Sequence, residues 1–157
     1  RNCKFFEPWI PEYEKNYYTY DYQILKLEYE KKLKEKGIEY RFYIFDKNIP
    51  ERIIGNVSVS NIIRGVLQSA FLGYSVDEEK NRKGIATEAV KRIIEFTFDE
   101  LILHRLEANV IPSNTASIKV LEKLNFVKEG YSENYLKING RWQDHLRYAL
   151  INKNYSG

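Results

Sequence analysis

The sequence predicts an α+β domain built around a largely antiparallel sheet. Two observations lead to this prediction. First, helical and strand patterns follow one another in a mixed order: a helix, three strands, a helix, a strand, a helix and a pair of strands. Second, the last two strands flank Asn139-Gly140, a residue pair typical of a two-residue hairpin turn.

The first half of the chain predicts one helix and three strands. Residues 3–16 are aromatic and interrupted by prolines, which indicates a helix end followed by a loop. Residues 17–36 place apolar side chains among charged ones and stop before Gly37, as a helix does. Gly55 lies inside the second of three aromatic and β-branched runs and indicates a bulge or bend there. The three predicted strands cover residues 40–46, 53–63 and 66–76.

The second half predicts two helices, a strand and the hairpin. Residues 84–98 carry two adjacent apolar stripes at helical spacing. A strand follows at 103–111, and then a short helix at 114–124, with Ser113 or Asn114 as its N-cap and Asn125 in a left-handed conformation at its end. The hairpin strands are residues 131–138 and 142–151.

Composition limits the classes of protein that the chain can belong to. It has 157 residues, of which 43% are hydrophobic and 30% charged, so it can form a core and is not a disordered chain. No repeat or linker divides it, and residues 1–157 are expected to form a single domain. The net charge of +3 is small and dispersed, which argues against direct nucleic-acid binding.

Cysteine content and hydropathy add two exclusions. The single cysteine excludes a disulfide framework and a multi-cysteine zinc site. No apolar run approaches the length of a membrane span, and no signal peptide is visible, so we expect a cytoplasmic protein without membrane contact.

The segment after the third predicted strand is a candidate anion site. The cationic loop Arg82-Lys83-Gly84 leads directly into a helix, whose first N–H groups are unpaired and can hold a phosphate. Gly84 allows a ligand to approach the backbone closely, and Ala86 keeps the first turn narrow. Neither of the two common phosphate-loop motifs matches. The alternative is an ordinary helix start with two solvated basic residues.

A second polar segment offers a carboxylate and a polar helix edge. On the predicted strand, Arg105, Glu107 and Asn109 share one face by the period of two. On the helix that follows, Asn114 and Ser117 lie along one edge. A carboxylate facing a polar helix start can form an acid–base site. The alternatives are a cross-strand ion pair for Glu107 and helix capping for Asn114 and Ser117.

Together these segments resemble the GNAT superfamily of acetyl-CoA-dependent N-acetyltransferases. Asn81-x-x-Gly84-x-Ala86 is similar to the pyrophosphate loop of the family, and Asn114-x-x-Ser117, followed by residues 121–126, is similar to its second CoA motif. Three segments are similar in sequence to one branch of the family, the ribosomal-protein-alanine N-acetyltransferases of the Rim type. These are residues 83–89 (KGIATEA), residues 104–108 (HRLEA) and Asn139-Gly140-x-Trp142-x-Asp144-His145.

The resemblance implies a particular version of the predicted fold. We expect a mixed, mostly antiparallel twisted sheet flanked by helices, an α/β three-layer arrangement. Members of the family usually begin with a strand and a helix, and this chain enters near the end of that helix. The resemblance therefore implies one N-acetyltransferase domain over residues 1–157, truncated at its N-terminus and lacking its first strand.

Acetyl-CoA is the cosubstrate that the resemblance implies, in a cleft between the strand ending at Val76 and the strand carrying Glu107. The Val76 main chain would pair with the pantetheine arm, and its amide is the candidate oxyanion donor. Residues implied in cofactor binding are Val76, Asn81, Arg82, Lys83, Gly84, Ile85, Ala86, Thr87, Asn114 and Ser117. No metal is expected, because His104 and His145 have no third ligand at metal spacing.

The implied reaction is direct attack of a primary amine on the thioester. Glu107 matches the position of the catalytic base in several family members, acting directly or through water. Many relatives carry a tyrosine acid where this sequence has Leu121, which cannot donate a proton. Ser117, one turn earlier on the same helix edge, is the candidate donor to the thiolate, and water is the alternative.

The implied acceptor is the N-terminal α-amine of a protein, such as a ribosomal protein. A small amine (polyamine, amino acid or aminoglycoside) is the second interpretation, and a non-catalytic CoA-binding module is the third. The aromatic N-terminal segment, with Phe5, Phe6, Trp9 and Tyr13, either lines the acceptor cleft or belongs to the core. His145 either lines that cleft or packs across the hairpin. A homodimer is a further expectation.

Overall fold

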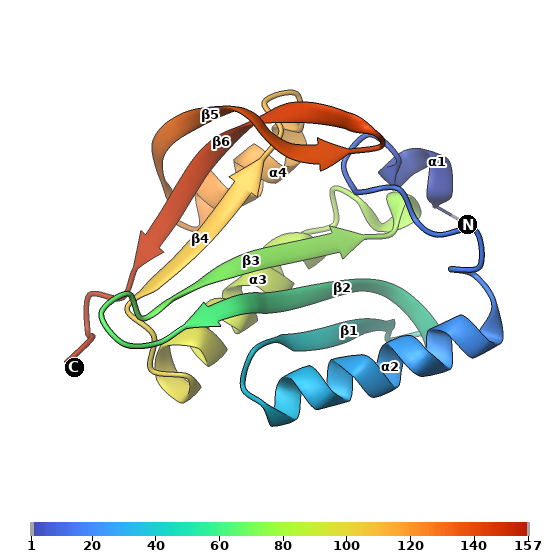
Figure 1. The fold of residues 1–157 in the computed structure, drawn as a ribbon, viewed down its shortest axis with the longest axis horizontal. Helices are drawn as coiled ribbons and strands as arrows, with labels where there is room; N and C mark the ends of the chain where they lie inside the picture. The colour runs from blue at the N-terminus through green and yellow to red at the C-terminus, as the bar shows by residue number, and fades with distance from the viewer. Residues whose placement is uncertain (1, 157) are drawn as a thin grey trace.

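The computed structural model describes residues 2–156 and shows helices on both faces of one mixed sheet (Figure 1). The strands lie in the order β1-β2-β3-β4-β6-β5, and all neighbours are antiparallel except β3 and β4. The elements are α1 (Cys3–Phe6), α2 (Tyr20–Glu35), β1 (Tyr40–Asp46), β2 (Ile49–Ile63), β3 (Ser69–Val76), a 3₁₀ turn η1 (Glu78–Lys80), α3 (Ile85–Glu95), a π-helical turn η2 (Phe96–Glu100), β4 (Arg105–Val110), α4 (Thr115–Lys123), β5 (Val127–Ile138) and β6 (Arg141–Ile151).

The predicted order of elements is confirmed, and several predicted boundaries differ. The α2 helix begins at Tyr20 rather than residue 17, because Thr19 caps it and accepts from the Tyr22 amide at 3.3 Å. The β3 strand begins at Ser69, three residues later than predicted, because Gly65 and Gln68 adopt positive φ angles of 70° and 43° and form a turn.

Two other predicted elements end or begin elsewhere. The helix predicted at 84–98 changes to a π-helical turn at Phe96, where the Leu101 amide donates to the carbonyl five residues earlier at 3.0 Å. The buried Thr97 hydroxyl donates to the Ile93 carbonyl at 2.6 Å and so competes with the regular helical pattern. The β5 strand begins at Val127, four residues before the predicted start, and its two register shifts obscure the period of two.

Special backbone positions occur where the sequence predicts them. Asn139 and Gly140 have φ angles of 45° and 76°, as a type I′ turn requires, and Asn125 has 64° just after α4. At Gly55 the register of β2 against β1 skips one residue, which is the predicted bulge. A Cβ at Gly55 would lie 2.4 Å from the Ser75 carbonyl oxygen, so only glycine permits this approach of β2 to β3.

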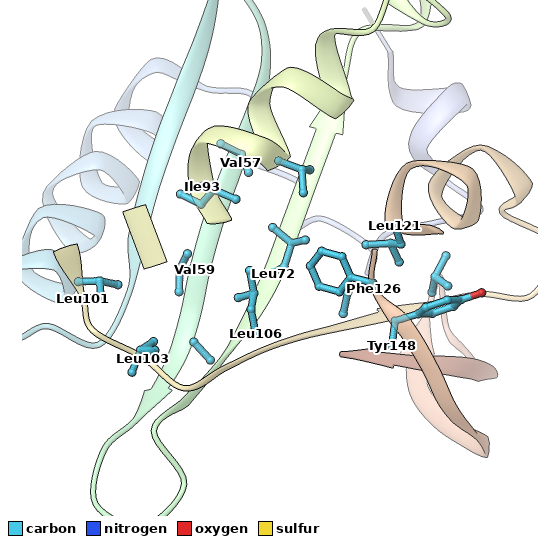
Figure 2. Packing of buried hydrophobic residues seen from close by; sticks show 14 of the residues in the cluster. Val57, Val59, Leu72, Ile93, Leu101, Leu103, Leu106, Leu121, Phe126 and Tyr148 are labelled. Carbon is cyan, nitrogen blue, oxygen red and sulfur yellow. The ribbon is translucent and has the colours of Figure 1, made fainter. Parts of the chain in front are cut away.

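The hydrophobic core lies between the sheet and the helices α3 and α4 (Figure 2). Alternation along β4 confirms the predicted period of two, because Leu106 and Ala108 are buried in this core while Glu107 lies on the opposite face. Leu121 of α4 is fully buried against Phe126 and its neighbours, which explains why an apolar residue suits this position. Among residues 2–156, no helix is long and apolar enough to cross a membrane.

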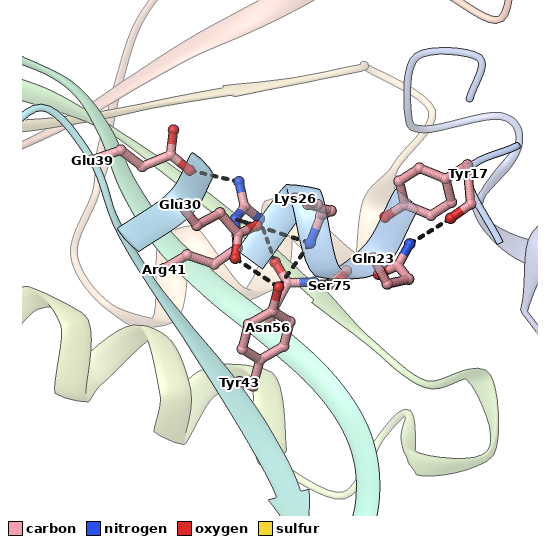
Figure 3. A network of polar contacts seen from close by, with 9 residues as sticks. All are labelled: Tyr17, Gln23, Lys26, Glu30, Glu39, Arg41, Tyr43, Asn56 and Ser75. Atoms are coloured by element: carbon pink, nitrogen blue, oxygen red, sulfur yellow. Dashed lines mark hydrogen bonds and ion pairs between the residues drawn. The ribbon is translucent and has the colours of Figure 1, made fainter. Parts of the chain in front are cut away.

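The opposite face of the sheet carries polar side chains that hold α2 (Figure 3). No residue of α2 is buried. Its Glu30 accepts a hydrogen bond from Tyr43 of β1 at 2.8 Å and forms an ion pair with Arg41 of β1 at 3.1 Å. Arg41 also donates to Asn56 Oδ1 at 2.9 Å, and Asn56 donates to Ser75 Oγ at 2.7 Å. A continuous polar chain therefore connects α2 with the C-terminal half of β3.

Candidate active site

Strands β3 and β4 pair over a short length and then separate (Figure 1). The parallel ladder joins residues 69–71 to residues 105–107 and goes no further. In the described chain, the rest of β3 therefore pairs with β2 alone, and a gap opens toward the C-terminal ends of the two strands. The resemblance places the expected acetyl-CoA site at this end of the two strands, between Val76 and the strand carrying Glu107.

The backbone amide of Val76 points into this gap. The Asp77 amide donates to the Ile54 carbonyl of β2 at 2.7 Å. Because successive residues of a strand direct their backbone groups to opposite edges, the Val76 N–H faces away from β2. It therefore points toward the edge of β3 that carries no strand at this end in the described chain.

The loop after β3 is anchored to the first two strands by buried acids. Asp77 accepts from the Glu79 amide at 3.2 Å, which caps η1, and it pairs with Arg52 of β2 at 3.0 Å. Lys80 pairs with Asp46 at the end of β1 at 2.6 Å, and the hydrogen bond from this ammonium lowers the pKa of Asp46. These contacts fix where α3 begins.

The cationic part of the loop is exposed and has an unusual backbone. Asn81, Arg82, Lys83 and Gly84 are all solvent-exposed. Both Arg82 and Gly84 have positive φ angles, 60° and 78°, a conformation that non-glycine residues rarely adopt. Such left-handed residues turn backbone N–H groups toward one side and form concave sites for anions. Gly84 has no side chain to cap α3, so the first N–H groups of that helix face outward beside two cations.

The start of α4 supplies a second polar edge. Asn114 is the N-cap, and its Oδ1 accepts from the Ser117 amide at 3.1 Å, which confirms the capping alternative for Asn114. Its side-chain NH₂ group is still a donor. The Ser117 hydroxyl lies 2.8 Å from the hydroxyl of Tyr74 on β3. Tyr74 did not stand out in the sequence, where it reads as one more inward-facing residue after Ala70 and Leu72.

Glu107 is held in an ion pair at the closed end of the gap. Its carboxylate lies 3.1 Å from Arg105 Nε and 3.1 Å from an Arg147 nitrogen, and it accepts from Ser69 Oγ at 3.0 Å. Burial raises the pKa of Glu107, but the hydrogen bonds and charges of Arg105, Ser69 and Arg147 outweigh it, and the net pKa is lowered. The carboxylate is therefore ionised at neutral pH and is a weak base. The cross-strand ion pair expected as an alternative is present.

A small aromatic pocket lies on the other face of the sheet, over Ser75, the residue that precedes Val76. Its volume is about 210 Å³, and Asn56 and Ser75 contribute polar groups to its wall. The remaining lining residues are Asn2, Cys3, Phe6, Ile10, Tyr13, Tyr17 and Tyr18. Two of the four predicted aromatic residues, Phe6 and Tyr13, thus line the pocket. The rings of Tyr13 and Tyr17 stack with centroids 3.7 Å apart.

His145 is buried within the terminal hairpin. Its Nδ1 lies 3.0 Å from the Gln143 carbonyl, and its ring contacts Tyr135 with centroids 5.7 Å apart. It is not among the residues that line the aromatic pocket, so it packs across the hairpin as the alternative expected. In the part of the chain that the structure describes, no three His, Cys, Asp or Glu side chains gather where they could hold a metal ion.

A larger groove, of about 850 Å³, lies along the outer edge of the sheet between β1 and α3. Phe42, Ile44 and Phe96 contribute apolar walls, and Lys83 of the cationic loop reaches its rim. Neither Ser117 nor Val76 lines it. Its size therefore says nothing about the chemistry at the gap between β3 and β4.

Residues 4–127 match the family described as "Acetyltransferase (GNAT) domain". The chain belongs to the GNAT acetyltransferase family. GNAT acetyltransferases use acetyl-CoA as donor, and the exposed cationic loop at the start of α3 suits its phosphates. The resemblance found in the motifs and the predicted fold class are both confirmed.

Several relatives of this GNAT domain have names that specify an activity. The chain is 47% identical over 96% of its length to a probable N-acetyltransferase, YjcK, of Bacillus subtilis, and covers 83% of it. It is 35% identical over 95% of its length to the [ribosomal protein uS5]-alanine N-acetyltransferase of Escherichia coli, and covers 76% of it. A spermidine N(1)-acetyltransferase of Vibrio cholerae is 29% identical over 74% of this chain and 66% of that protein.

Solved structures show the same GNAT architecture. The ribosomal-protein-S5-alanine acetyltransferase from Vibrio fischeri superposes with a TM-score of 0.95 and 38% identity, over 100% of this chain and 85% of that one. Mycobacterium smegmatis RimJ, solved with CoA-disulfide, gives a TM-score of 0.90 and 29% identity, over 99% of this chain and 75% of that one.

Proposed function

We propose that this N-acetyltransferase transfers the acetyl group of acetyl-CoA to the N-terminal α-amine of a protein, such as a ribosomal protein. The observation that carries the choice of acceptor is the aromatic pocket over Ser75, whose described lining contains no acidic side chain. A polyamine carries several positive charges, and burying them requires paired carboxylates. An N-terminal alanine brings one amine and a methyl group, which suit a small, uncharged, aromatic pocket. The names of the two ribosomal-protein relatives support the same choice.

Binding of acetyl-CoA is assigned to three groups of this chain. The backbone amides of residues 82–87, with the Arg82 and Lys83 side chains, would hold the pyrophosphate. The open edge of β3 near Val76 would pair with the pantetheine amides, because no strand occupies it in the described chain. The Asn114 side-chain NH₂ and the Ser117 hydroxyl would complete the site from α4. Asn81 and the residues of the first turn of α3, Ile85, Ala86 and Thr87, belong to the same proposed cofactor site.

The acyl transfer needs an oxyanion donor, a base and a proton for the thiolate. The Val76 N–H would stabilise the oxyanion that forms when the amine attacks the thioester carbonyl. Glu107 is the proposed base and acts through water. After attack, the nitrogen carries a positive charge and is more acidic than the parent ammonium, so a weak carboxylate base suffices. The Ser117 hydroxyl would donate its proton to the sulfur as the C–S bond breaks.

The test is a panel of acceptors in one assay. The protein is incubated with acetyl-CoA and an alanine-initiated peptide, its N-terminally blocked twin with an internal lysine, or spermidine, and free thiol release is followed. We expect release only with the free α-amine, with the added mass located at residue 1 of the peptide by mass spectrometry. Faster turnover of spermidine would replace the proposed acceptor, and tight CoA binding without any turnover would indicate a non-catalytic module.

A further inference from the structure

Tyr74 connects the two walls of the gap between β3 and β4. Its side chain starts on β3, two residues before Val76, and ends at the first turn of α4. The Tyr74 hydroxyl lies 2.8 Å from Ser117 Oγ and 3.2 Å from the Ser117 carbonyl oxygen, and its single proton can be donated fully to only one of them. In the 2.8 Å contact either oxygen can be the donor.

The surroundings keep this hydroxyl protonated. The Tyr74 ring packs against the hydrophobic core, and burial raises the pKa of Tyr74 to about 12, although the hydrogen bond to Ser117 lowers it. At neutral pH the phenol therefore remains a donor. Many relatives place a tyrosine acid at the position of Leu121, whose apolar side chain is fully buried in this chain. A tyrosine hydroxyl reaches the same helix from the β3 side instead.

The direction of the contact determines what Ser117 can do. A serine hydroxyl has one proton and two acceptor lone pairs. If Ser117 donates to Tyr74, or to a carbonyl of its own helix, no proton remains for a ligand. If Tyr74 donates to Ser117 Oγ, the serine proton is free to point elsewhere. The Asn114 cap meanwhile fixes the Ser117 backbone through a 3.1 Å hydrogen bond.

We propose that Tyr74 is a positioning residue that donates to Ser117 Oγ and thereby directs the serine proton to the sulfur of the departing CoA. This inference rests on the proposed role of Ser117. As the C–S bond breaks, its electron pair stays on sulfur and an S–H bond forms with the Ser117 proton. The Tyr74 proton passes to Oγ, which leaves a phenolate rather than the less stable serine alkoxide. The phenolate then takes a proton from solvent, and Glu107 releases to solvent the proton that it received from the nitrogen through water.

A double-mutant cycle tests this inference. Tyr74→Phe and Ser117→Ala are each expected to lower kcat with the alanine-initiated peptide by about ten-fold or more, as loss of general acid catalysis does. In Tyr74→Phe the acetyl-CoA affinity, measured by calorimetry, should change less than about two-fold, because the phenylalanine ring keeps the shape of the site and Ser117 is retained. The double variant should be no slower than Ser117→Ala, because Tyr74 acts only through Ser117. Ser117→Thr, which keeps the hydroxyl, should retain most of kcat.

Three results would overturn the inference, and they are distinguishable. If Tyr74→Phe slows the Ser117→Ala variant as much as it slows the wild type, Tyr74 acts independently of Ser117. If Tyr74→Phe alters only acetyl-CoA affinity or the unfolding temperature, its role is structural. If Ser117→Ala keeps wild-type kcat, the proposed role of Ser117 fails and the Tyr74 inference fails with it, whereas the acceptor panel still tests the acetyl transfer itself. Circular dichroism of each variant confirms that it is folded under the assay conditions.

Discussion

Glu107 is held by donors from three different strands, and this arrangement decides its chemistry. Ser69 of β3, Arg105 of β4 and Arg147 of β6 all contact its carboxylate. Such a group keeps its negative charge over the whole range in which an amine becomes neutral. In the proposed mechanism it accepts a proton from the nitrogen only after attack, and in the folded protein it neutralises two guanidinium groups.

Glu107→Gln separates these two contributions. We expect kcat/KM for the peptide to fall at least about ten-fold at every pH at which the carboxylate is ionised, as the loss of a general base predicts. We also expect the free energy of unfolding to fall by about 1–2 kcal/mol, between the values for exposed and buried ion pairs. A pH–rate profile and urea unfolding give the two numbers. A kcat/KM that is unchanged over the whole pH profile, combined with lower stability, assigns Glu107 to the ion pair alone.

Gly84 tests the anion loop. A Cβ at this position meets no protein atom within 4 Å, but the φ angle of 78° strains any L side chain. Gly84→Val is expected to weaken acetyl-CoA binding about ten-fold or more by crowding the phosphates and by moving the backbone. Gly84→Asn is the matched control, because asparagine tolerates the left-handed conformation while still adding a side chain. Acetyl-CoA affinity is measured by calorimetry, and weak binding in both variants indicates crowding. Native affinity in the valine variant would contradict the assignment of the loop to phosphate binding.

At the scale of elements, local chemistry was predictable and contacts between elements were not. The Asn139-Gly140 turn, the Asn114 cap and the Gly55 bulge depend on their own residues and close neighbours, and the structure has all three. The early separation of β3 from β4 depends on pairing between strands some thirty-five residues apart, as the match of Phe71 to Glu107 shows. The Tyr74 contact to α4 is of the same long-range kind, because the two partners are 43 positions apart in the sequence. No local pattern encodes either.

The N-terminus of α4 serves the helix and, in our proposal, the ligand. Asn114→Ala removes the cap and should lower the free energy of unfolding by about 1 kcal/mol, and acetyl-CoA affinity should fall as well. Asn114→Asp keeps the capping oxygen and favours the helix N-terminus, but it lacks the NH₂ donor. We therefore expect native stability and weak acetyl-CoA binding in the aspartate variant. Native affinity in that variant would remove Asn114 from the proposed site.

For the whole molecule, paired carboxylates set the response to acid. Lys80 lowers the pKa of Asp46, Arg105 lowers that of Glu129, and the Tyr131 hydroxyl lowers that of Asp144. Groups with lowered pKa values bind fewer protons in the folded state than in the unfolded state near their ordinary values of 3.8 for Asp and 4.5 for Glu. Their contribution is present above those values and is lost as the pH falls through the lowered pKa values.

The urea midpoint should therefore change little between pH 8 and pH 6 on account of these carboxylates, and fall steeply between about pH 5 and pH 3. Raising the salt concentration at pH 7 should reproduce part of the loss, because exposed ion pairs are screened. Asp46→Asn is the comparison variant, and its acid-dependent loss should be smaller than that of the wild type. A midpoint that stays constant down to pH 3 would show that these pairs contribute nothing to folding.

If the donor pairs with the edge of β3 as proposed, the short ladder between β3 and β4 makes the thermal stability of this protein a measure of donor binding. A ligand whose amides pair with the free edge of β3 acts as an additional strand and binds only the folded chain. At a concentration one hundred times its dissociation constant, such a ligand adds about 2.7 kcal/mol to the free energy of unfolding. For a chain of this length that raises the unfolding temperature by about 5–10 °C. Melting curves in the presence of acetyl-CoA, CoA and other thioesters would thus rank donors before any acceptor is known.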